Sequence, residues 1–517
     1  MGSEMCIRDS NTAVIKQDDV DLINYPLDYE SANYTEADKL QSLDYYANKQ
    51  SPDGPAMTYS LYSISANALS PSGCSAYTYA LNGFQPYTRA PWYQFSEQQV
   101  DNPNTNGGTN PAFPFMTGAG GWHQIGPMGW LGARVTESQL VIQPALPPQI
   151  PHVSLRTLIF GGTGLKAVMN YTHTTLTRVT PSSYLLPPNT TDRYANTTMP
   201  ITVGFSIDSG YNISLALGQT LTIANRLYFD NTTTQGNILQ CLPLATSSSS
   251  TSFQPGQFPL AAIDGAASTR WQPSTRNATS ITIDMRTIPY QSVSGVSFDW
   301  GARPASTARI QLYNSSSSSS SSSLSAANDA SSGAETVFTF SPITASSPYN
   351  ATSAAVIEPY TGNMSFFTFS PSSGGQVYSG DYLTLTIEGC LQSGDELGAT
   401  VAEFNLFAAN GSGVLSGANG VSSGSDSGNG NGTVSVGAGM AGGAANQTVS
   451  VGTATAVRTS GAVSGIATAG LGGNNTATAT GTGAPIAASS SGQGVLGVRD
   501  GMSWGVGLLL VVLVLVL

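Results

Sequence analysis

The stretch APWYQFSEQQVDNPNTNGGTNPAFPFMTGAGGWHQIGPMGWLG, residues 90–132, gathers aromatic, amide and glycine residues around one carboxylate, Glu97. Trp92 lies shortly before Glu97, and His123 and Gln124 follow it. Aromatic rings stack on sugar faces, amides bond hydroxyls, and glycines let the backbone approach a ligand. A carboxylate among such groups is a candidate acid or base for glycosidic chemistry. On residue types alone, a solvated charge beside a Gly-rich turn is the commoner situation, because carboxylates are usually exposed.

Long strings of the chain resemble the fungal acid trehalases, in glycoside hydrolase family 65, which also holds maltose and kojibiose phosphorylases. Besides 90–132, the strings are residues 14–29, 45–80, 140–178 and 241–410. The resemblance implies a multidomain α + β chain: the C-terminal part of an (α/α)6 catalytic barrel over 11–135, a β-sandwich over 136–240 and a discoidin or coagulation-factor type C-like β jelly roll over 241–410. The helical part is too short to close a barrel, so we expect the upstream helices to be absent from this chain.

The resemblance implies that the activity is hydrolysis of α,α-trehalose to glucose and that Glu97 is the general base. In an inverting reaction, one carboxylic acid protonates the leaving oxygen while the opposed carboxylate activates water. The family's general acid lies upstream of Lys16, and no position here matches it. We therefore expect a fragment that is inactive alone and an N-terminally truncated form of an active parent.

The predicted substrate-binding residues are Lys16, Gln17, Trp92, His123 and Gln124. Lys16 and Gln17 match a pair that touches the sugar in the phosphorylase relatives. The loop at 70–72 sits where phosphorylases cradle phosphate, but it continues as Gly-Cys-Ser rather than in their pattern, which favours water as the acceptor. Two alternatives stay open. One is another α-glucoside hydrolase or phosphorylase of the same family, and the other is a glycan-binding surface adhesin built on the jelly roll.

Composition limits the partners. Charged residues make up only 9% of the chain, against about 25% in typical proteins. The net charge of −12 and the pI near 4.6 disfavour nucleic acid as a partner. The histidines at 123, 152 and 173 lack metal-ligand spacing, so we expect no catalytic metal and no cofactor. An Asp-Gly pair at 264–265 is a weak sign of structural calcium. The expected partners are trehalose or related α-glucosides and cell-wall glycans.

Hydrophobic periodicity predicts the regular structure. Helices are expected near 18–22, 36–48, 58–69 and 76–81, and the turn residues at 70–73 separate the last two. Short β-rich runs predict strands at 141–142, 153–160, 165–171, 174–179, 201–207 and 220–223. Trp271 and Trp300 lie in strings that resemble core positions of the jelly roll, with a role as sugar platforms as the second interpretation.

Sequons spread along the chain predict a glycosylated secretory protein. They begin at Asn33, Asn170, Asn189, Asn196, Asn212, Asn231, Asn277, Asn314, Asn350, Asn363, Asn410, Asn431, Asn446 and Asn474. The sequence has 4 cysteines, and Cys6 falls in residues 1–10, which match nothing in the family and are interpreted as a non-native leader. Cys241 and Cys390 flank the jelly roll, whose ends often lie together, so a disulfide between them is expected.

The tail differs in composition from the rest. Residues 411–492 are Gly, Ser, Thr and Ala with almost no charge or aromatics, which predicts a disordered, O-glycosylated stalk. Residues 493–517 predict a hydrophobic C-terminal anchor signal, because the run from 504 is shorter than the roughly 20 residues of a transmembrane helix. The small residues Ser490, Ser491 and Gly492 precede a spacer, as attachment of a glycolipid anchor requires, and a plain tail anchor is the alternative. The expected location is the extracellular cell surface or wall, with anchoring to the membrane.

Overall fold

The computed structural model describes residues 15–436, with gaps at 32, 52–53, 107, 137–138, 206–209, 227–232, 246–251, 289–292, 302, 315–335, 344–363, 370–379, 392–395, 409–418 and 424–430. These residues all belong to one compact unit of the chain, formed by 1–439 and 512–517. The predicted leader, the anchor residues Ser490, Ser491 and Gly492, the anchor signal and most of the predicted stalk lie outside the described residues. Most of the described structure is β-sheet, with few helices.

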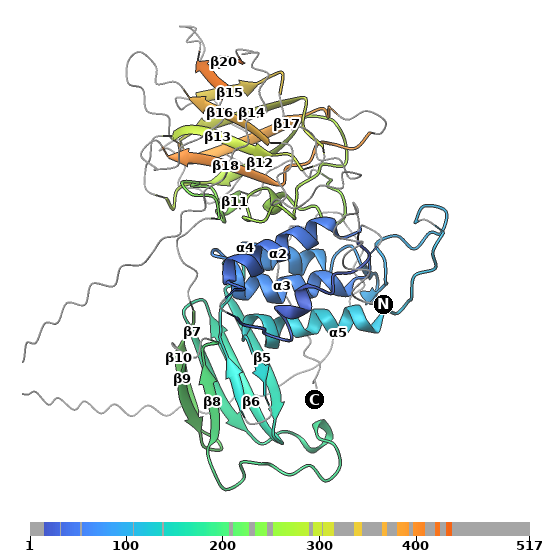
Figure 1. The fold of residues 1–517 in the computed structure, drawn as a ribbon, viewed down its shortest axis with the longest axis vertical. Coiled ribbons are helices and arrows are strands. Elements are labelled where there is room, and N and C mark those ends of the chain that lie inside the picture. Colours follow the sequence, from blue (N-terminus) through green and yellow to red (C-terminus); the bar gives the residue numbers. More distant parts are fainter. Residues whose placement is uncertain are drawn as a thin grey trace, which may run out of the picture. The chain divides into compact units, whose positions relative to one another are not determined.

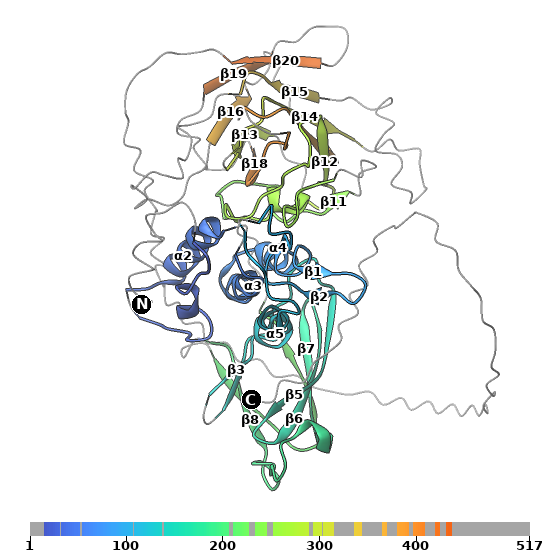
Figure 2. The ribbon, with the colours of Figure 1, turned by 90° about the vertical axis from the view of Figure 1, so that its right-hand side faces the viewer.

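The helices come first in the chain, and one of them lies at the centre of the group. They are η1 (Asp21–Ile23), α2 (Glu36–Lys49), α3 (Met57–Leu69), α4 (Cys74–Asn82), α5 (Met116–Gln124) and the π-helical turn η2 (Ile125–Trp130). α3 packs against α2, α4 and α5, as the end-on view in Figure 2 shows. The helices predicted at 36–48, 58–69 and 76–81 are confirmed, whereas the one predicted at 18–22 is only the short turn η1.

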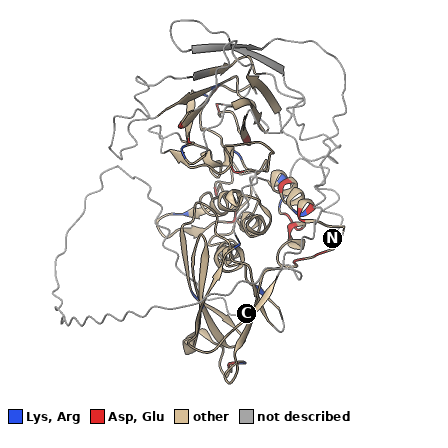
Figure 3. Ribbon diagram, turned by 90° about the vertical axis from the view of Figure 1, so that its left-hand side faces the viewer, with Lys and Arg blue, Asp and Glu red and all other residues tan. Residues whose placement is uncertain are grey.

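Local sequence explains where two of these helices begin and end. Thr35 and Asp38 form a capping box that starts α2, each satisfying a backbone N–H of the other. α3 ends at Leu69 because Ser70 is extended and a proline follows it. Charged residues are sparse on the ribbon and gather mostly on α2 and its neighbourhood (Figure 3).

The strands between 134 and 224 form two four-stranded sheets (Figure 1). One has the order β10-β7-β6-β5 and the other β3-β4-β8-β9. Their bounds are β3 (Arg134–Val135), β4 (Leu140–Ile142), β5 (His152–Phe160), β6 (Thr163–Asn170), β7 (His173–Val179), β8 (Met199–Val203), β9 (Tyr211–Leu215) and β10 (Thr220–Ala224). The strands predicted here are confirmed. β9, whose sequence YNISL alternates apolar and polar residues, was not predicted; it pairs antiparallel with β8.

The later strands share one ten-stranded sheet around an aromatic core. They are β11 (Leu244–Ala245), β12 (Thr279–Asp284), β13 (Val293–Asp299), β14 (Thr307–Tyr313), β15 (Thr336–Phe340), β16 (Met364–Phe369), β17 (Tyr382–Glu388), β18 (Glu403–Ala408), β19 (Asn419–Ser423) and β20 (Asn431–Val436). Trp271 and Trp300 are fully buried in this core, and Phe298 stacks on Trp300. The core interpretation of both tryptophans is confirmed, and their use as sugar platforms is excluded.

The prediction of a stalk without regular structure from 411 onward is wrong for two short segments. β20 pairs with β15 and β19 pairs with β16, each in parallel. β19 and β20 also pair with each other, antiparallel. The edges of β15 and β16 carry unpaired backbone groups that accept a further strand, whatever its side chains. The composition of the stalk gave no sign of this backbone pairing.

The predicted disulfide between Cys241 and Cys390 is also wrong. Cys241 is bonded to Cys74 at the start of α4, with the Cα atoms 5.8 Å apart, and Cys390 is a buried free thiol. The chain before the jelly roll returns to the turn that precedes α4, where the Gln240 amide donates to the Ser72 hydroxyl at 3.0 Å. That return path, and not the ends of the jelly roll, brings the cysteines together.

Buried carboxyl groups link the helices to the part of the chain that carries the ten-stranded sheet. Asp44 on α2 accepts hydrogen bonds from the backbone N–H (2.9 Å) and the hydroxyl of Ser268, which also bonds to the Tyr79 hydroxyl of α4. Asp264, fully buried, accepts from the Thr269 hydroxyl at 2.9 and 2.8 Å.

Glu403 of β18 completes this carboxyl cluster by accepting from the Gly265 N–H at 2.8 Å. Burial raises the pKa of Asp264 to about 7 and raises those of Asp44 and Glu403 above their ordinary range, and neighbouring carboxyls add to the effect at Asp264 and Glu403.

Stability is expected to fall as pH rises from about 4 to about 7. A carboxyl whose pKa is higher in the folded state binds its proton more tightly there, so folding is favoured at acid pH and the benefit is lost as pH passes the folded pKa. The Asp264→Asn variant should flatten this dependence in urea unfolding, and Glu388→Gln, at an exposed position on β17, should not. An unchanged slope in Asp264→Asn would contradict the prediction.

Candidate functional site

A short hairpin precedes the candidate base. β1 (Thr88–Arg89) pairs with β2 (Gln94–Phe95), and the tip between them carries Trp92 and Tyr93. Their exposed fractions are 81% and 59%, so both rings face solvent. Trp92 can therefore contact a substrate only if the substrate extends to the hairpin tip, or if a further protein segment covers that tip.

Glu97 is held between the start of α3 and the segment that leads to α5. Its N–H donates to the Ala112 carbonyl at 3.0 Å, and its carbonyl accepts from the N–H of Ala56, the N-cap residue of α3, at 2.9 Å. Its carboxylate Oε2 accepts from the Ala112 N–H at 2.9 Å. The side chain is half-buried, so one face of the carboxylate is fixed by the backbone while the residue keeps contact with solvent.

The predicted sugar-binding pair lies against the same short segment. The Lys16 carbonyl accepts from the Gln50 amide at 2.8 Å, and a Cβ on Gly54 would lie only 2.6 Å from that carbonyl. Gly54 is two residues before Ala56, which bonds to Glu97. The backbones of Lys16 and Glu97 are thus both brought to residues 54–56, at the start of α3. The Lys16 side chain is exposed.

Two aspartates that we did not predict hold the segment after Lys16 and Gln17, and one of them bonds to α3. Asp21 accepts from the Ser65 hydroxyl of α3 at 2.7 Å and from the Asn24 amide at 2.8 Å. Asp18 accepts from the N–H groups of Val20 (2.7 Å) and Asp21 (3.2 Å). Burial raises their pKa values to about 6 for Asp18 and about 7 for Asp21. The signal available in the sequence was the aspartate-rich run that directly follows Lys16 and Gln17.

His123 and Gln124 lie at the other end of α5 from the Glu97 segment. The Phe115 N–H donates to the Phe95 carbonyl at 2.7 Å and so ties the start of α5 to β2, while His123 and Gln124 end the helix. Gln124 accepts from the Tyr25 hydroxyl at 2.6 Å. Burial lowers the pKa of His123, which favours the neutral ring. Among the described contacts, no hydrogen bond or ring contact joins either residue to Glu97.

The loop at 70–72 does not lie beside Glu97. It follows the C-terminal end of α3, whereas Glu97 contacts the N-terminal end, and a helix of 13 residues spans about 20 Å. Ser72 instead bonds to Gln240 next to the disulfide. The described contacts thus do not join this loop to Glu97, and the preference for water over phosphate as the acceptor stays a prediction.

In the part of the chain that the structure describes, no group of His, Cys, Asp and Glu residues gathers in a way that could hold a metal ion. No helix there is both long and apolar enough to cross a membrane. The sequon asparagines whose exposure is described are all exposed: Asn33, Asn170, Asn189, Asn196, Asn212, Asn277 and Asn314. Asn431 lies in β20. Those at 231, 350, 363, 410, 446 and 474 lie outside the described residues.

Known proteins similar to the chain include acid trehalases from fungi. The chain is 41% identical over 411 residues to an acid trehalase of Emericella nidulans, a match that covers 77% of this chain and 37% of that protein. It is 45% identical over 307 residues to a cell wall acid trehalase of Arthroderma benhamiae, covering 58% of this chain and 28% of that protein. The chain thus spans well under half the length of either relative. The predicted resemblance to the fungal acid trehalases is confirmed.

No protein-family model matches the chain. Among solved structures, a putative kojibiose phosphorylase from the human microbiome aligns with 41% of this chain and 24% of that chain, at 16% identity and a TM-score of 0.27. At this TM-score the alignment does not define a shared fold. Membership of family 65 and the discoidin-like character of the jelly roll stay predictions.

Proposed function

We propose that this chain is part of an acid trehalase that hydrolyses α,α-trehalose to glucose, with Glu97 as the general base. The observation that carries the proposal is the meeting of the Lys16 and Glu97 backbones at residues 54–56. This meeting of Lys16 and Glu97 at the start of α3 supports a shared site for the predicted sugar-binding pair and the predicted base. The similarity to acid trehalases over most of this chain supports the choice of substrate.

The chemistry at this site is an inverting displacement. Glu97 accepts a proton from a water molecule as that water attacks the anomeric carbon, while a carboxylic acid on the opposite side protonates the leaving sugar oxygen. Asp18 and Asp21 are the buried carboxyls next to Lys16 and Gln17; both oxygens of Asp21 and Oδ1 of Asp18 accept hydrogen bonds within the protein. Because no position of this chain matches the family's general acid, we assign the acid to a part of the parent protein outside this chain, and expect the chain alone to be inactive.

The wider organisation follows from the same proposal. The helices up to η2 are the last part of an (α/α)6 barrel, the two four-stranded sheets are the β-sandwich behind it, and the ten-stranded sheet is a discoidin-like module. We propose an extracellular, cell-wall location with N-glycans on the exposed sequons, since one similar protein is a cell wall acid trehalase. A glycolipid anchor at Ser490, Ser491 or Gly492 belongs to this proposal.

Glucose release from α,α-trehalose by the full-length protein tests the function. We expect hydrolysis at the same rate with and without inorganic phosphate, and equal amounts of α- and β-glucose in proton NMR spectra taken before the anomers equilibrate. Inversion at one anomeric carbon produces one β-glucose, and the leaving sugar keeps its α configuration. Activity only with phosphate would identify a phosphorylase instead. No turnover of trehalose under either condition would refute the proposal.

A further inference from the structure

We propose that Arg89 is a positioning residue for Glu97, an assignment that rests on the proposed function for its catalytic meaning. Arg89 ends β1, eight residues before Glu97 in the chain, and does not touch its carboxylate. It acts by holding the loop in which Glu97 lies.

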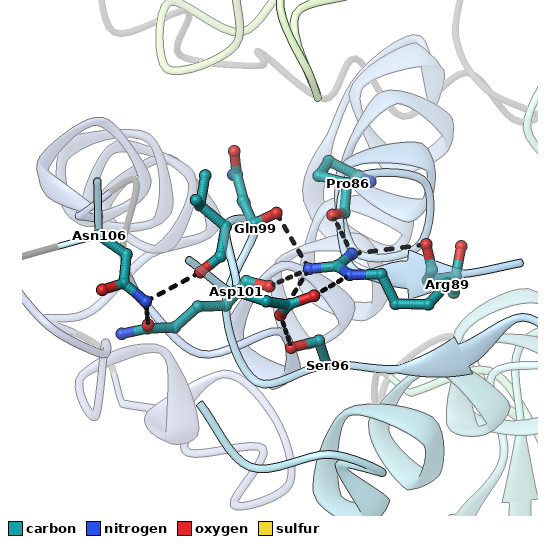
Figure 4. A network of polar contacts seen from close by, with 9 residues as sticks. Pro86, Arg89, Ser96, Gln99, Asp101 and Asn106 are labelled. Atoms are coloured by element: carbon teal, nitrogen blue, oxygen red, sulfur yellow. Dashed lines mark hydrogen bonds and ion pairs between the residues drawn. The ribbon is translucent and has the colours of Figure 1, made fainter. Parts of the chain in front are cut away.

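The Arg89 guanidinium joins the chain before the hairpin to the chain after Glu97 (Figure 4). Nη1 donates to the Pro86 carbonyl at 2.9 Å, and Nη2 donates to the carbonyls of Gln98 (2.8 Å) and Gln99 (3.0 Å). A planar guanidinium presents its donors in a fixed fork, so these acceptors are held in one relative arrangement. The residues directly after Glu97 thereby cannot shift without breaking hydrogen bonds to Arg89.

Asp101 closes the network from the other side. Its carboxylate accepts from Arg89 Nε at 2.6 Å and Nη2 at 3.0 Å, and from the Ser96 hydroxyl at 2.6 Å. Ser96 directly precedes Glu97. The hydrogen bond from Arg89 holds the pKa of Asp101 below its usual range, which favours the charged form of the carboxylate. Both neighbours of Glu97 in the sequence, Ser96 and Gln98, are therefore tied to one ion pair.

The far side of the loop has its own polar anchor. The Asn106 amide donates to the carbonyls of Val100 and Thr109, each at 3.0 Å, and to Gln98 Oε1 at 3.3 Å. This fixes the turn that returns the chain to Ala112, the residue whose N–H holds the Glu97 carboxylate. Among the described contacts, it is the backbone N–H of Ala112 that orients that carboxylate, so its direction depends on the register between the segments at 96–101 and 109–112. Arg89 holds the first of these segments, residues 96–101, in place.

Arg178 provides a matched control. It is buried on β7, donates to the carbonyls of Thr197 (2.8 Å) and Tyr194 (2.7 Å), and pairs with Asp192 at 2.9 Å. Its bonding resembles that of Arg89, but its partners lie in the sheet region and none of them contacts the Glu97 loop. Loss of Arg178 should destabilise the protein without moving Glu97.

The test compares Arg89→Ala, Arg89→Lys, Asp101→Asn and Arg178→Lys in the full-length protein. For Arg89→Ala we expect kcat per folded molecule to fall roughly 100-fold, because a carboxylate misplaced by about 1 Å costs that much, while KM changes little. Arg89→Lys, which keeps the charge without the fork, should recover only part of the rate, and Asp101→Asn should lower kcat in the same direction. Arg178→Lys should keep its kcat. Wild-type kcat in Arg89→Ala, or an equal loss in Arg178→Lys, would overturn the proposal.

Hydrogen exchange on the present chain separates this proposal from the proposed function. In Arg89→Ala, the amides of Glu97 and Ala112 should exchange at least tenfold faster, while those of β7 keep their rates, because their hydrogen bonds depend on the register that Arg89 holds. Unchanged protection of both amides would refute the positioning role even if trehalose is the substrate. Faster exchange together with a full-length protein that does not cleave trehalose would refute only the proposed function.

Discussion

The Glu97→Gln variant of the full-length protein is expected to lose at least 10³-fold in kcat for trehalose, within the roughly 10²–10⁴-fold range of general-base catalysis. Gln has nearly the same shape as Glu, and its carbonyl oxygen can still accept the Ala112 N–H that the carboxylate accepts at 2.9 Å. The backbone bonds of Glu97 to Ala56 and Ala112 do not involve the side chain. The loss should therefore appear in the rate and not in folding.

The measurement is a set of kcat and KM values beside urea unfolding of the same preparations. KM should stay within a few-fold of the wild-type value, because a general base contributes mainly in the transition state. Glu388→Gln, on the jelly-roll strand β17, is the matched control and should retain full activity. Normal turnover by Glu97→Gln would remove Glu97 from the mechanism. A loss that coincides with unfolding would show that the residue is structural.

The local elements of this fold could be predicted from sequence, but their connections could not. The apolar spacing of α3 and the alternation of β5, β6 and β7 are set by neighbours in the sequence, so periodicity located them. β9 was missed although its sequence, YNISL, alternates apolar and polar residues. β19 and β20 were missed because strand addition at an open edge depends on backbone groups and not on side-chain pattern.

The candidate site divides in the same way. Long resembling strings pointed to Glu97 and Lys16, and the structure brings both backbones to residues 54–56. The roles of Arg89 and Asp21 could not be predicted, because each acts through partners that become neighbours only when the chain folds. The position of the 70–72 loop relative to Glu97 could not be predicted for a related reason: residue spacing does not reveal at which end of a helix another segment will lie.

Breaking the Cys74–Cys241 disulfide is expected to cost about 5 kcal/mol of stability in the chain-entropy model, because the bond closes a loop of 167 residues. The loop contains α4, α5, η2 and both four-stranded sheets, so the unfolded chain gains much freedom when it opens. Urea unfolding of Cys74→Ser should show this loss, and a reducing agent should lower the stability of the wild type but not of the variant.

Cys390 provides the control and the decisive pairing test. It is buried and free, so Cys390→Ala removes one small buried group and should cost much less than Cys74→Ser. Mass mapping under non-reducing conditions should recover a peptide that links Cys74 to Cys241, with Cys390 alkylated after denaturation. A peptide that links Cys241 to Cys390 would contradict the Cys74–Cys241 bond and support the pairing expected from the sequence. Such a pairing would remove the covalent link between the turn before α4 and the segment at 240–241. The Gln240–Ser72 hydrogen bond would then still join the two segments.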